Sequence, residues 1–136
     1  MIQEVVTLVQ SDAVIRNVPV HLDLLEELPH VLGDRIQIQQ VLLNLILNGF
    51  DAMSDVHREP RDLIIKAEYE NNKEVKVSVG DSGTGIQPDH MKLIFEPFHT
   101  TKADGMGMGL SINRSIILAH QGKLWAENNV NRGATF

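Results

Sequence analysis

Residues 37–53 read QIQQVLLNLILNGFDAM, a stretch with the periodicity of an amphipathic helix. Apolar residues recur at intervals of three and four and form one broad side: Ile38, Val41, Leu42, Leu45 and Ile46. Polar residues recur at the same intervals and form a narrow stripe: Gln37, Gln40, Asn44, Asn48, Asp51 and, one turn further, Asp55. A solvated helix face would explain such a stripe, but these faces usually carry Lys, Arg or Glu, and residues 37–53 contain none. Because side chains four apart lie one above the other, Asn44 and Asn48 could present both amides to one ligand.

Length and composition fit one globular domain and exclude several functions. The 136 residues carry a net charge of -6 and no basic run, so we expect no nucleic-acid partner. The absence of cysteine excludes disulfides and thiolate metal sites, and the six histidines lack the close spacing of a zinc site. No apolar run approaches the ~20 residues of a membrane span, and no signal peptide is visible. We expect a cytoplasmic domain without direct membrane contact, whose parent protein could be membrane-anchored.

Helical and strand patterns alternate with turn signals along the rest of the chain. They predict helices at residues 2–16 and 111–120, with Asp34 as the N-cap of the central helix and Gly122 as the C-cap of the last one. They predict strands at residues 18–24, 63–69, 74–79, 123–127 and 133–136, an extended piece at 31–32 and a turn at Asn71-Asn72. The expected class is α+β, a two-layer sandwich in which helices cover one face of a mixed, mostly antiparallel sheet. The patterns run to both ends of the chain, so we expect one domain, residues 1–136, taken from a longer protein.

A first glycine-rich segment, Asp81-Ser-Gly83-Thr-Gly85, follows a predicted strand. Glycines allow a ligand to approach the backbone closely, and a carboxylate at the end of a strand can accept hydrogen bonds from an exocyclic amine. A simple turn is the alternative interpretation, since Asp and Gly dominate turns.

A second glycine-rich segment, DGMGMGLS at residues 104–111, opens the last predicted helix. The backbone N–H groups without helical partners and the helix dipole at a helix start favour binding of an anion such as a phosphate. A loop without a ligand is the alternative interpretation. The segment is neither the GxGxxG of dinucleotide folds nor a P-loop. Between the two segments lies FEPFHTTK at residues 95–102, whose hydroxyls and Lys could meet a phosphate. Its alternative is a surface loop pinned by Phe95 and Phe98.

Each segment is a weak signal alone, but their order along the chain is specific. In this order the chain resembles the ATP-binding catalytic domain of sensor histidine kinases, in the wider GHKL ATPase superfamily. The N box of that family matches Asn44-Leu-Ile-Leu-Asn48, its two glycine boxes match residues 81–85 and 105–110, and its F box matches Phe95-Glu-Pro-Phe98. The resemblance covers nearly the whole chain and looks closest to the PAS-linked, oxygen- and nitrogen-sensing kinases. It implies the GHKL (Bergerat) ATP-binding fold.

The resemblance implies a metal and phosphate side of the site. Asn48 would coordinate Mg²⁺ through its amide oxygen, which suits a hard cation shared with a triphosphate. Asn44 would lie one turn away near the phosphates, and Asn44, Asn48 and Lys102 are the expected catalytic residues. The loop at residues 96–108 would be the ATP lid. The other nucleotide contacts expected on this side are Asp51, Phe98, Thr100, Thr101, Gly105, Met106, Gly107, Met108, Gly109 and Leu110.

The resemblance also implies an adenine side. Asp81 would accept the adenine amino group, and Thr135 would join Asp81 and a water at the base. Three further residues of this side follow the strand: Gly83 and Gly85, which would let the purine approach, and Ile86.

Two residues depart from the family pattern. Gly49 stands where many relatives have Ala, a change that weakens a helix by about 1 kcal/mol. Asp51 stands where many sensor kinases place a basic residue.

The function implied by the resemblance is phosphotransfer. ATP would give its γ-phosphoryl group to a histidine on the dimerisation and phosphoacceptor domain of the same protein. A response regulator would be the next partner of that domain. We expect this fragment to be a monomer and its parent a homodimer. A GHKL hydrolase is the alternative, but those enzymes carry a Glu at the position of Asn44, and an amide cannot act as a general base. A nucleotide-binding module without catalysis is a third possibility.

Overall fold

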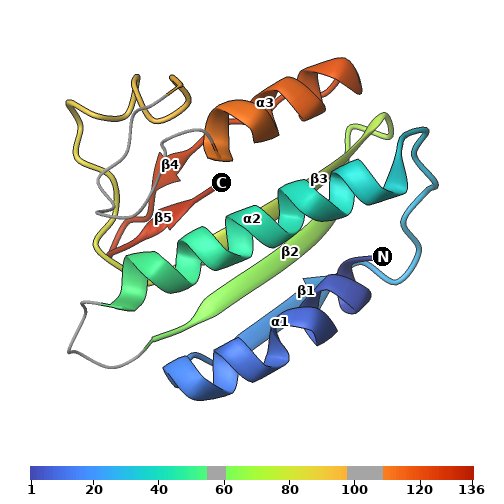
Figure 1. Ribbon diagram of the computed structural model, residues 1–136. Helices are drawn as coiled ribbons and strands as arrows, with labels where there is room; N and C mark the ends of the chain where they lie inside the picture. The colour runs from blue at the N-terminus through green and yellow to red at the C-terminus, as the bar shows by residue number, and fades with distance from the viewer. Residues whose placement is uncertain (55–60, 98–108) are drawn as a thin grey trace.

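The computed structural model describes residues 1–54, 61–97 and 109–136 (Figure 1). Helices and strands follow one another in this order: α1 (Ile2–Arg16), β1 (Val20–Leu24), α2 (Arg35–Ser54), β2 (Leu63–Glu70), β3 (Glu74–Asp81), α3 (Gly109–Ala119), β4 (Glu127–Asn128) and β5 (Ala134–Thr135). Helix α2 begins where the sequence predicts, because Oδ1 of Asp34 accepts a hydrogen bond of 3.1 Å from the backbone N–H of Gln37. Among the described residues, no helix is both long and apolar enough to cross a membrane.

The five strands form one sheet in the order β1-β2-β3-β5-β4. Strands β1 and β2 are parallel because α2 makes the crossover between them, and the other neighbouring pairs are antiparallel. Strands β2 and β3 form a hairpin whose turn residues Asn71 and Asn72 have positive φ angles of 51° and 53°. Positive φ at both central residues is typical of a type I′ turn, which is closed here by a hydrogen bond of 3.0 Å from the N–H of Lys73 to the carbonyl of Glu70. The predicted mixed, mostly antiparallel sheet is confirmed.

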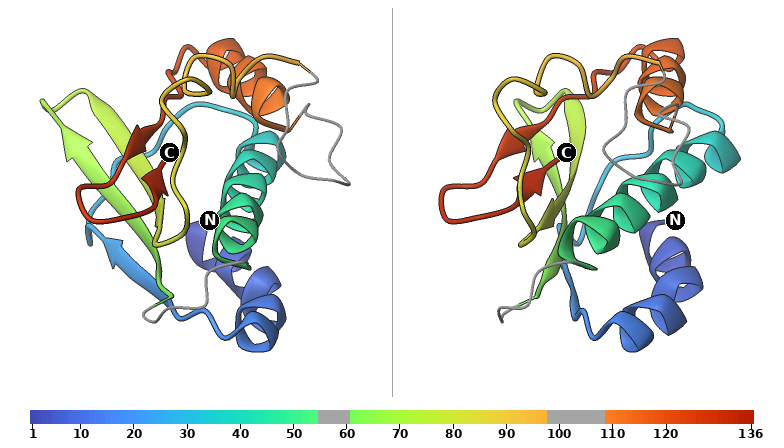
Figure 2. Two further views of the ribbon diagram at one scale, coloured as in Figure 1. Left: turned by 90° about the vertical axis from the view of Figure 1, so that its left-hand side faces the viewer. Right: turned by 60° about the vertical axis from the view of Figure 1, so that its left-hand side comes forward.

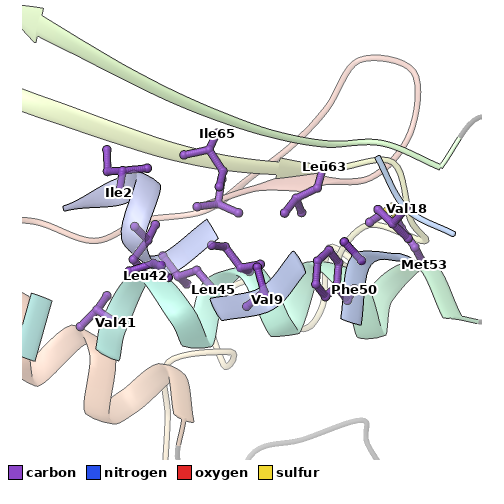
Figure 3. Packing of buried hydrophobic residues seen from close by; sticks show 14 of the residues in the cluster. Ile2, Val9, Val18, Val41, Leu42, Leu45, Phe50, Met53, Leu63 and Ile65 are labelled. Atoms are coloured by element: carbon purple, nitrogen blue, oxygen red, sulfur yellow. The ribbon is translucent and has the colours of Figure 1, made fainter. Parts of the chain in front are cut away.

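The helices lie together on one side of the sheet, and Figure 2 shows this two-layer arrangement edge-on. Figure 3 shows Leu63 and Ile65 of β2 pointing toward Leu45 and Phe50 of α2. Leu63, Ile65 and Phe50 are completely buried. Burial of each such side chain contributes about 1.5–3 kcal/mol, so this layer fixes α2 against the middle of the sheet. The apolar side of the helix thus faces the core, and its polar stripe faces away from it.

Three local predictions need correction. Of the expected strand at residues 123–127 only Glu127 lies in a strand, and β4 extends one residue beyond the expected range, to Asn128, where it pairs with the two-residue strand β5. The extended piece at residues 31–32 is not part of a strand. The residue with left-handed backbone at the end of α3 is Gln121 (φ 61°), one position before the predicted Gly122. The N–H of Gly122 donates to the carbonyl of Ile117 (2.9 Å), the pattern of a Schellman motif.

Only part of the apolar side of α3 packs against the core. Leu110, Ile116 and Ile117 pack against the core, but Ile112 is 43% exposed. Ile112 and Ala119 instead line a shallow groove between α2 and α3.

Candidate functional site

The carboxyl group of Asp81 lies at the end of β3 and is almost completely buried. Its Oδ1 accepts hydrogen bonds from the backbone N–H groups of Gly83 (2.8 Å) and Ala134 (3.3 Å). Burial raises the pKa of Asp81, and the two backbone hydrogen bonds partly oppose that rise. Within the described part of the chain, no hydrogen bond reaches Oδ2. The group is therefore a fixed carboxyl with one oxygen available to a donor.

Thr135 of β5 is held beside Asp81 by a side chain that the sequence did not suggest. Its hydroxyl donates a hydrogen bond of 2.6 Å to Oδ1 of Asn129, and Nδ2 of Asn129 donates to the backbone carbonyl of Asp81 (2.9 Å). Thr135 also lies directly opposite Gly80 in the sheet register. A Cβ atom at Gly80 would be 3.0 Å from Oγ1 of Thr135, so the glycine leaves room for this hydroxyl. The structure thus brings Asp81 and Thr135 close together, and their contacts with a base stay a prediction.

The turn after β3 is clamped from two sides. A Cβ atom at Gly83 would lie 2.4 Å from the backbone oxygen of Ala52, so only glycine permits this contact with α2. The N–H of Thr84 donates to the same oxygen (3.3 Å). Gly85 has a positive φ of 75°, and the next residue, Ile86, is held by a side-chain amide. Close packing within the protein therefore accounts for both glycines.

The amide that holds Ile86 belongs to Asn128, which the sequence also did not suggest. The backbone N–H of Ile86 donates to Oδ1 of Asn128, and Nδ2 of Asn128 donates to the backbone carbonyl of Ile86, both at 2.7 Å. These two hydrogen bonds resemble those between neighbouring strands, and they attach the turn to β4.

Helix α2 approaches Asp81 at Gly49. A Cβ atom at Gly49 would lie 3.6 Å from Cβ of Asp81 and 2.5 Å from Cδ1 of Leu63. The helix backbone thus passes directly beside the end of β3. Asn48, the residue before Gly49, and Asn44, one turn earlier, are both half-buried on this helix.

Two members of the stripe have partners on other helices. Nδ2 of Asn44 donates a hydrogen bond of 3.1 Å to Oδ1 of Asn113 in α3. Asp51 forms an ion pair of 3.0 Å with Arg16 at the end of α1, and Arg16 also lies over the ring of Phe50 at 5.9 Å. An acidic residue at position 51 therefore has a structural partner that a basic residue would repel.

The predicted phosphate side is described only in part. Gly109 and Leu110 are the first two residues of α3, so the N-terminal amides of this helix belong to the end of the second glycine box. Most other residues predicted for this side lie outside the described part of the chain: Phe98, Thr100, Thr101, Lys102, Gly105, Met106, Gly107 and Met108. Of the predicted lid, only Glu96 and Pro97 are described, and Asp55 of the polar stripe also falls outside.

A family model described as histidine kinase-, DNA gyrase B- and HSP90-like ATPase matches residues 33–136. The chain is 49% identical over 106 residues to the sensor protein FixL of Bradyrhizobium diazoefficiens, covering 78% of this chain and 21% of FixL. It is 41% identical to the sensor protein TdiS of Thauera aromatica, covering all of this chain and 25% of TdiS. The chain therefore spans only about a quarter or less of these relatives.

Solved structures of histidine kinases have the same fold. The catalytic domain of the histidine kinase ThkA matches with a TM-score of 0.84 and 37% identity, covering 99% of this chain and 87% of that domain. A full-length ShkA structure in complex with AMPPNP matches with a TM-score of 0.85 and 27% identity, over 99% of this chain and 28% of that one. ThkA in complex with the response regulator protein TrrA matches with a TM-score of 0.81 and 34% identity, over 99% and 37% of the two chains.

The motif order and the five-stranded mixed sheet with its helical layer agree with these matches. The chain belongs to the histidine kinase-, DNA gyrase B- and HSP90-like ATPase family, and its relatives place it among the catalytic domains of sensor histidine kinases.

Proposed function

We propose that this domain binds Mg²⁺-ATP and donates the γ-phosphoryl group to a histidine on a separate dimerisation and phosphoacceptor domain of its parent protein. The observation that carries the proposal is the buried carboxyl group of Asp81, which keeps Oδ2 for a donor beside Thr135. The AMPPNP complex of the similar kinase ShkA supports a nucleotide as the ligand.

The base side of the site fits adenine by its chemistry. The exocyclic amino group of adenine is a donor, which the carboxyl oxygen of Asp81 can accept. Guanine and hypoxanthine carry a carbonyl oxygen at the same ring position, and two acceptors would face each other there. A buried site that loses a hydrogen bond in this way rejects the wrong ligand strongly.

The phosphate side fits a magnesium-bound triphosphate. Asn48 is the residue that would hold Mg²⁺ through its amide oxygen, with Asn44 nearby, because hard cations prefer oxygen ligands. The described residues contain no group of three acidic or histidine side chains that could hold a metal by themselves, so phosphate oxygens would complete the coordination. Bound Mg²⁺ would neutralise charge on the phosphates. The N–H groups of Gly109 and Leu110, at the start of α3, would donate to phosphate oxygens. The further contacts remain predictions: Phe98, Thr100, Thr101, Lys102, Gly105, Met106, Gly107 and Met108.

The chemistry of Asn44 favours transfer over hydrolysis. A hydrolase of this superfamily needs a general base that orients water one turn before the metal-binding Asn. Here that position carries an amide, whose NH₂ group is already bound to Asn113. An amide has no basic site to take a proton from water. The phosphoryl group would therefore be transferred to an acceptor on a separate domain. The intact set of motifs argues against a module that only binds nucleotide.

The partners follow from the same proposal. The phosphoacceptor domain would receive the phosphoryl group, and a response regulator would take it from there, as the ThkA–TrrA complex suggests by similarity. We further propose that the isolated domain is a cytoplasmic monomer and that the parent protein is a homodimer.

The base assignment can be tested with matched ligands. Inosine diphosphate differs from ADP at the base by a carbonyl oxygen in place of the amino group. Calorimetric titration should show ADP binding at least roughly tenfold more tightly than IDP or GDP, since a site built to bind an N–H group rejects its absence. Equal affinities for ADP and IDP would overturn the assignment of Asp81 to the amino group.

A further inference from the structure

Asn113, the fifth residue of α3, is completely buried and has one hydrogen-bond partner. Its Oδ1 accepts the bond of 3.1 Å from Nδ2 of Asn44, across the contact between α3 and α2. Its own Nδ2 is buried without a partner. A buried donor without an acceptor destabilises a fold, and such groups are rare in native proteins. An apolar side chain would pack here without that cost. The bond to Asn44 is the one interaction that Asn113 makes and an apolar residue could not.

The bond to Asn113 decides which end of the Asn44 amide is available to a ligand. A primary amide has an NH₂ donor at one end and a carbonyl acceptor at the other. The NH₂ of Asn44 is occupied by Asn113, and within the described residues its carbonyl oxygen makes no hydrogen bond. Rotation of the Asn44 amide alone by half a turn would place its oxygen against Oδ1 of Asn113, an unfavourable contact between two acceptors. Rotation of both amides would reverse the bond, and the Asn113→Asp variant below tests that alternative.

We propose that Asn113 is a positioning residue that turns the NH₂ group of Asn44 into the helix contact and leaves its carbonyl oxygen for the Mg²⁺-phosphate side. This inference rests on the proposed function. The amide oxygen of Asn44 then lies one helical turn from Asn48, the proposed Mg²⁺ ligand, and is a hard donor suited to Mg²⁺ or its bound water. The contact also ties α2 to the helix that follows the second glycine box.

The inference predicts a change in magnesium dependence, separate from any change in stability. The probe is AMPPNP, titrated by calorimetry once with Mg²⁺ and once with EDTA, and the quantity compared is the gain in affinity that Mg²⁺ gives. In Asn113→Leu this gain should fall about tenfold, as expected for the loss of one good polar contact, while affinity in EDTA stays the same. The melting temperature should not fall, because the unpartnered buried donor has been removed.

Two further variants separate positioning from packing. Asn113→Asp keeps an acceptor for Asn44 and removes the NH₂ group, so its carboxylate can bind Asn44 only in the orientation proposed. The titrations are run at alkaline pH, where the carboxyl group is ionised and has no O–H to donate. Asn113→Asp should preserve the wild-type gain from Mg²⁺ and carries the test even if the leucine variant does not fold. Ile117→Val, which trims a side chain of α3 that packs on the core, should lower stability without changing the gain.

The outcomes distinguish this inference from the proposed function. A normal Mg²⁺ gain in folded Asn113→Leu would overturn the role of Asn113, and so would a lost gain in Asn113→Asp, because Asn113 would then act through its NH₂ group. Wild-type protein that binds no AMPPNP at all would instead overturn the proposed function. A reduced gain in Asn113→Leu with a preserved gain in Asn113→Asp establishes the positioning role.

Discussion

The hydroxyl group of Thr135 donates a hydrogen bond of 2.6 Å to Oδ1 of Asn129. The NH₂ group of Asn129 donates in turn to the backbone carbonyls of Asp81 (2.9 Å) and Arg132 (3.3 Å). One side chain thus joins the end of β3 to β5 at the place where the base is proposed to bind. Because the hydroxyl proton of Thr135 is engaged, its oxygen is left to accept a hydrogen bond from a ligand or a water.

Replacement of Asn129 by leucine should weaken nucleotide binding through Thr135. The hydroxyl group would be free to rotate, and the carbonyl of Asp81 would lose a donor. We expect ADP affinity to fall about three- to tenfold and the free energy of unfolding to fall by about 1 kcal/mol, the contribution of an ordinary hydrogen bond. Calorimetry and urea unfolding measure the two effects. Asn131→Leu, in the same loop and exposed, is the control. Equal ADP affinity in the two variants would contradict the role of Asn129 in holding Thr135.

Replacement of Asp81 by asparagine should abolish recognition of the amino group. An amide can still accept from the two backbone N–H groups, but it then turns a donor toward the adenine donor. The loss of affinity for ADP should be roughly 1–3 kcal/mol or more. The exposed Asp89 supplies a matched control, because Asp89→Asn makes the same chemical change at the surface. If ADP binds Asp81→Asn and Asp89→Asn equally well, Asp81 does not contact the base.

The raised pKa of Asp81 predicts how ADP binding depends on pH. Burial raises this pKa above 3.8, and a proton on the carboxyl group competes with the adenine amino group. The affinity should therefore increase as pH rises through the pKa of Asp81 and become constant above it. On acidification, affinity should begin to fall at a higher pH than for an ordinary Asp. Titrations over a pH series test this, and the dependence should be lost in Asp81→Asn.

The same pKa has a consequence for stability in the absence of nucleotide. A carboxyl group with a raised folded-state pKa contributes stability below its unfolded pKa and loses that contribution as pH rises through the folded pKa. The wild-type protein should therefore lose stability relative to Asp81→Asn over this interval, which begins near 3.8. Denaturant unfolding of both proteins at several pH values gives the difference. A wild-type advantage that grows with pH would show that the pKa is lowered instead.

Asn48→Asp should alter the response to Mg²⁺ more than the recognition of adenine. The substitution changes a proposed metal ligand and leaves Asp81 and Thr135 in place. Calorimetric titration of ADP, once with Mg²⁺ and once with EDTA, separates the two effects. If ADP affinity in EDTA falls as far as affinity with Mg²⁺, Asn48 is not the metal ligand.

Local signals predicted much of the fold. The cap of α2 needs only Asp34 and Gln37, three residues apart, and the hairpin turn needs only Asn71 and Asn72. The periodic pattern at residues 37–53 was sufficient to orient α2, because every apolar position on its broad side could be buried together. The order of the motifs along the chain then indicated the family and the pairing of Asp81 with Thr135.

The residues that hold the site in place could not be predicted in the same way. Asn128 and Ile86 are 42 positions apart, and Asn44 and Asn113 are 69 apart. An Asn has the same local sequence pattern whether its side chain is solvated or bound to a distant group. Only the pairing of the strands and the packing of α3 on α2 bring these partners together. The length of β4 was overestimated for a related reason, since it depends on its partner β5.

The most direct measurement of the central claim uses ATP labelled in its γ-phosphoryl group. Phosphoryl transfer depends on positioning, so a histidine that is merely present cannot replace the proper acceptor. None of the six histidines of this chain lies in the acidic helical context of the family's phosphoacceptor. The isolated domain should therefore remain unlabelled. Addition of its own dimerisation and phosphoacceptor domain should yield label on that partner, stable to base and labile to acid. Stoichiometric, base-stable label on the isolated domain, or an unlabelled partner after mixing, would contradict the account.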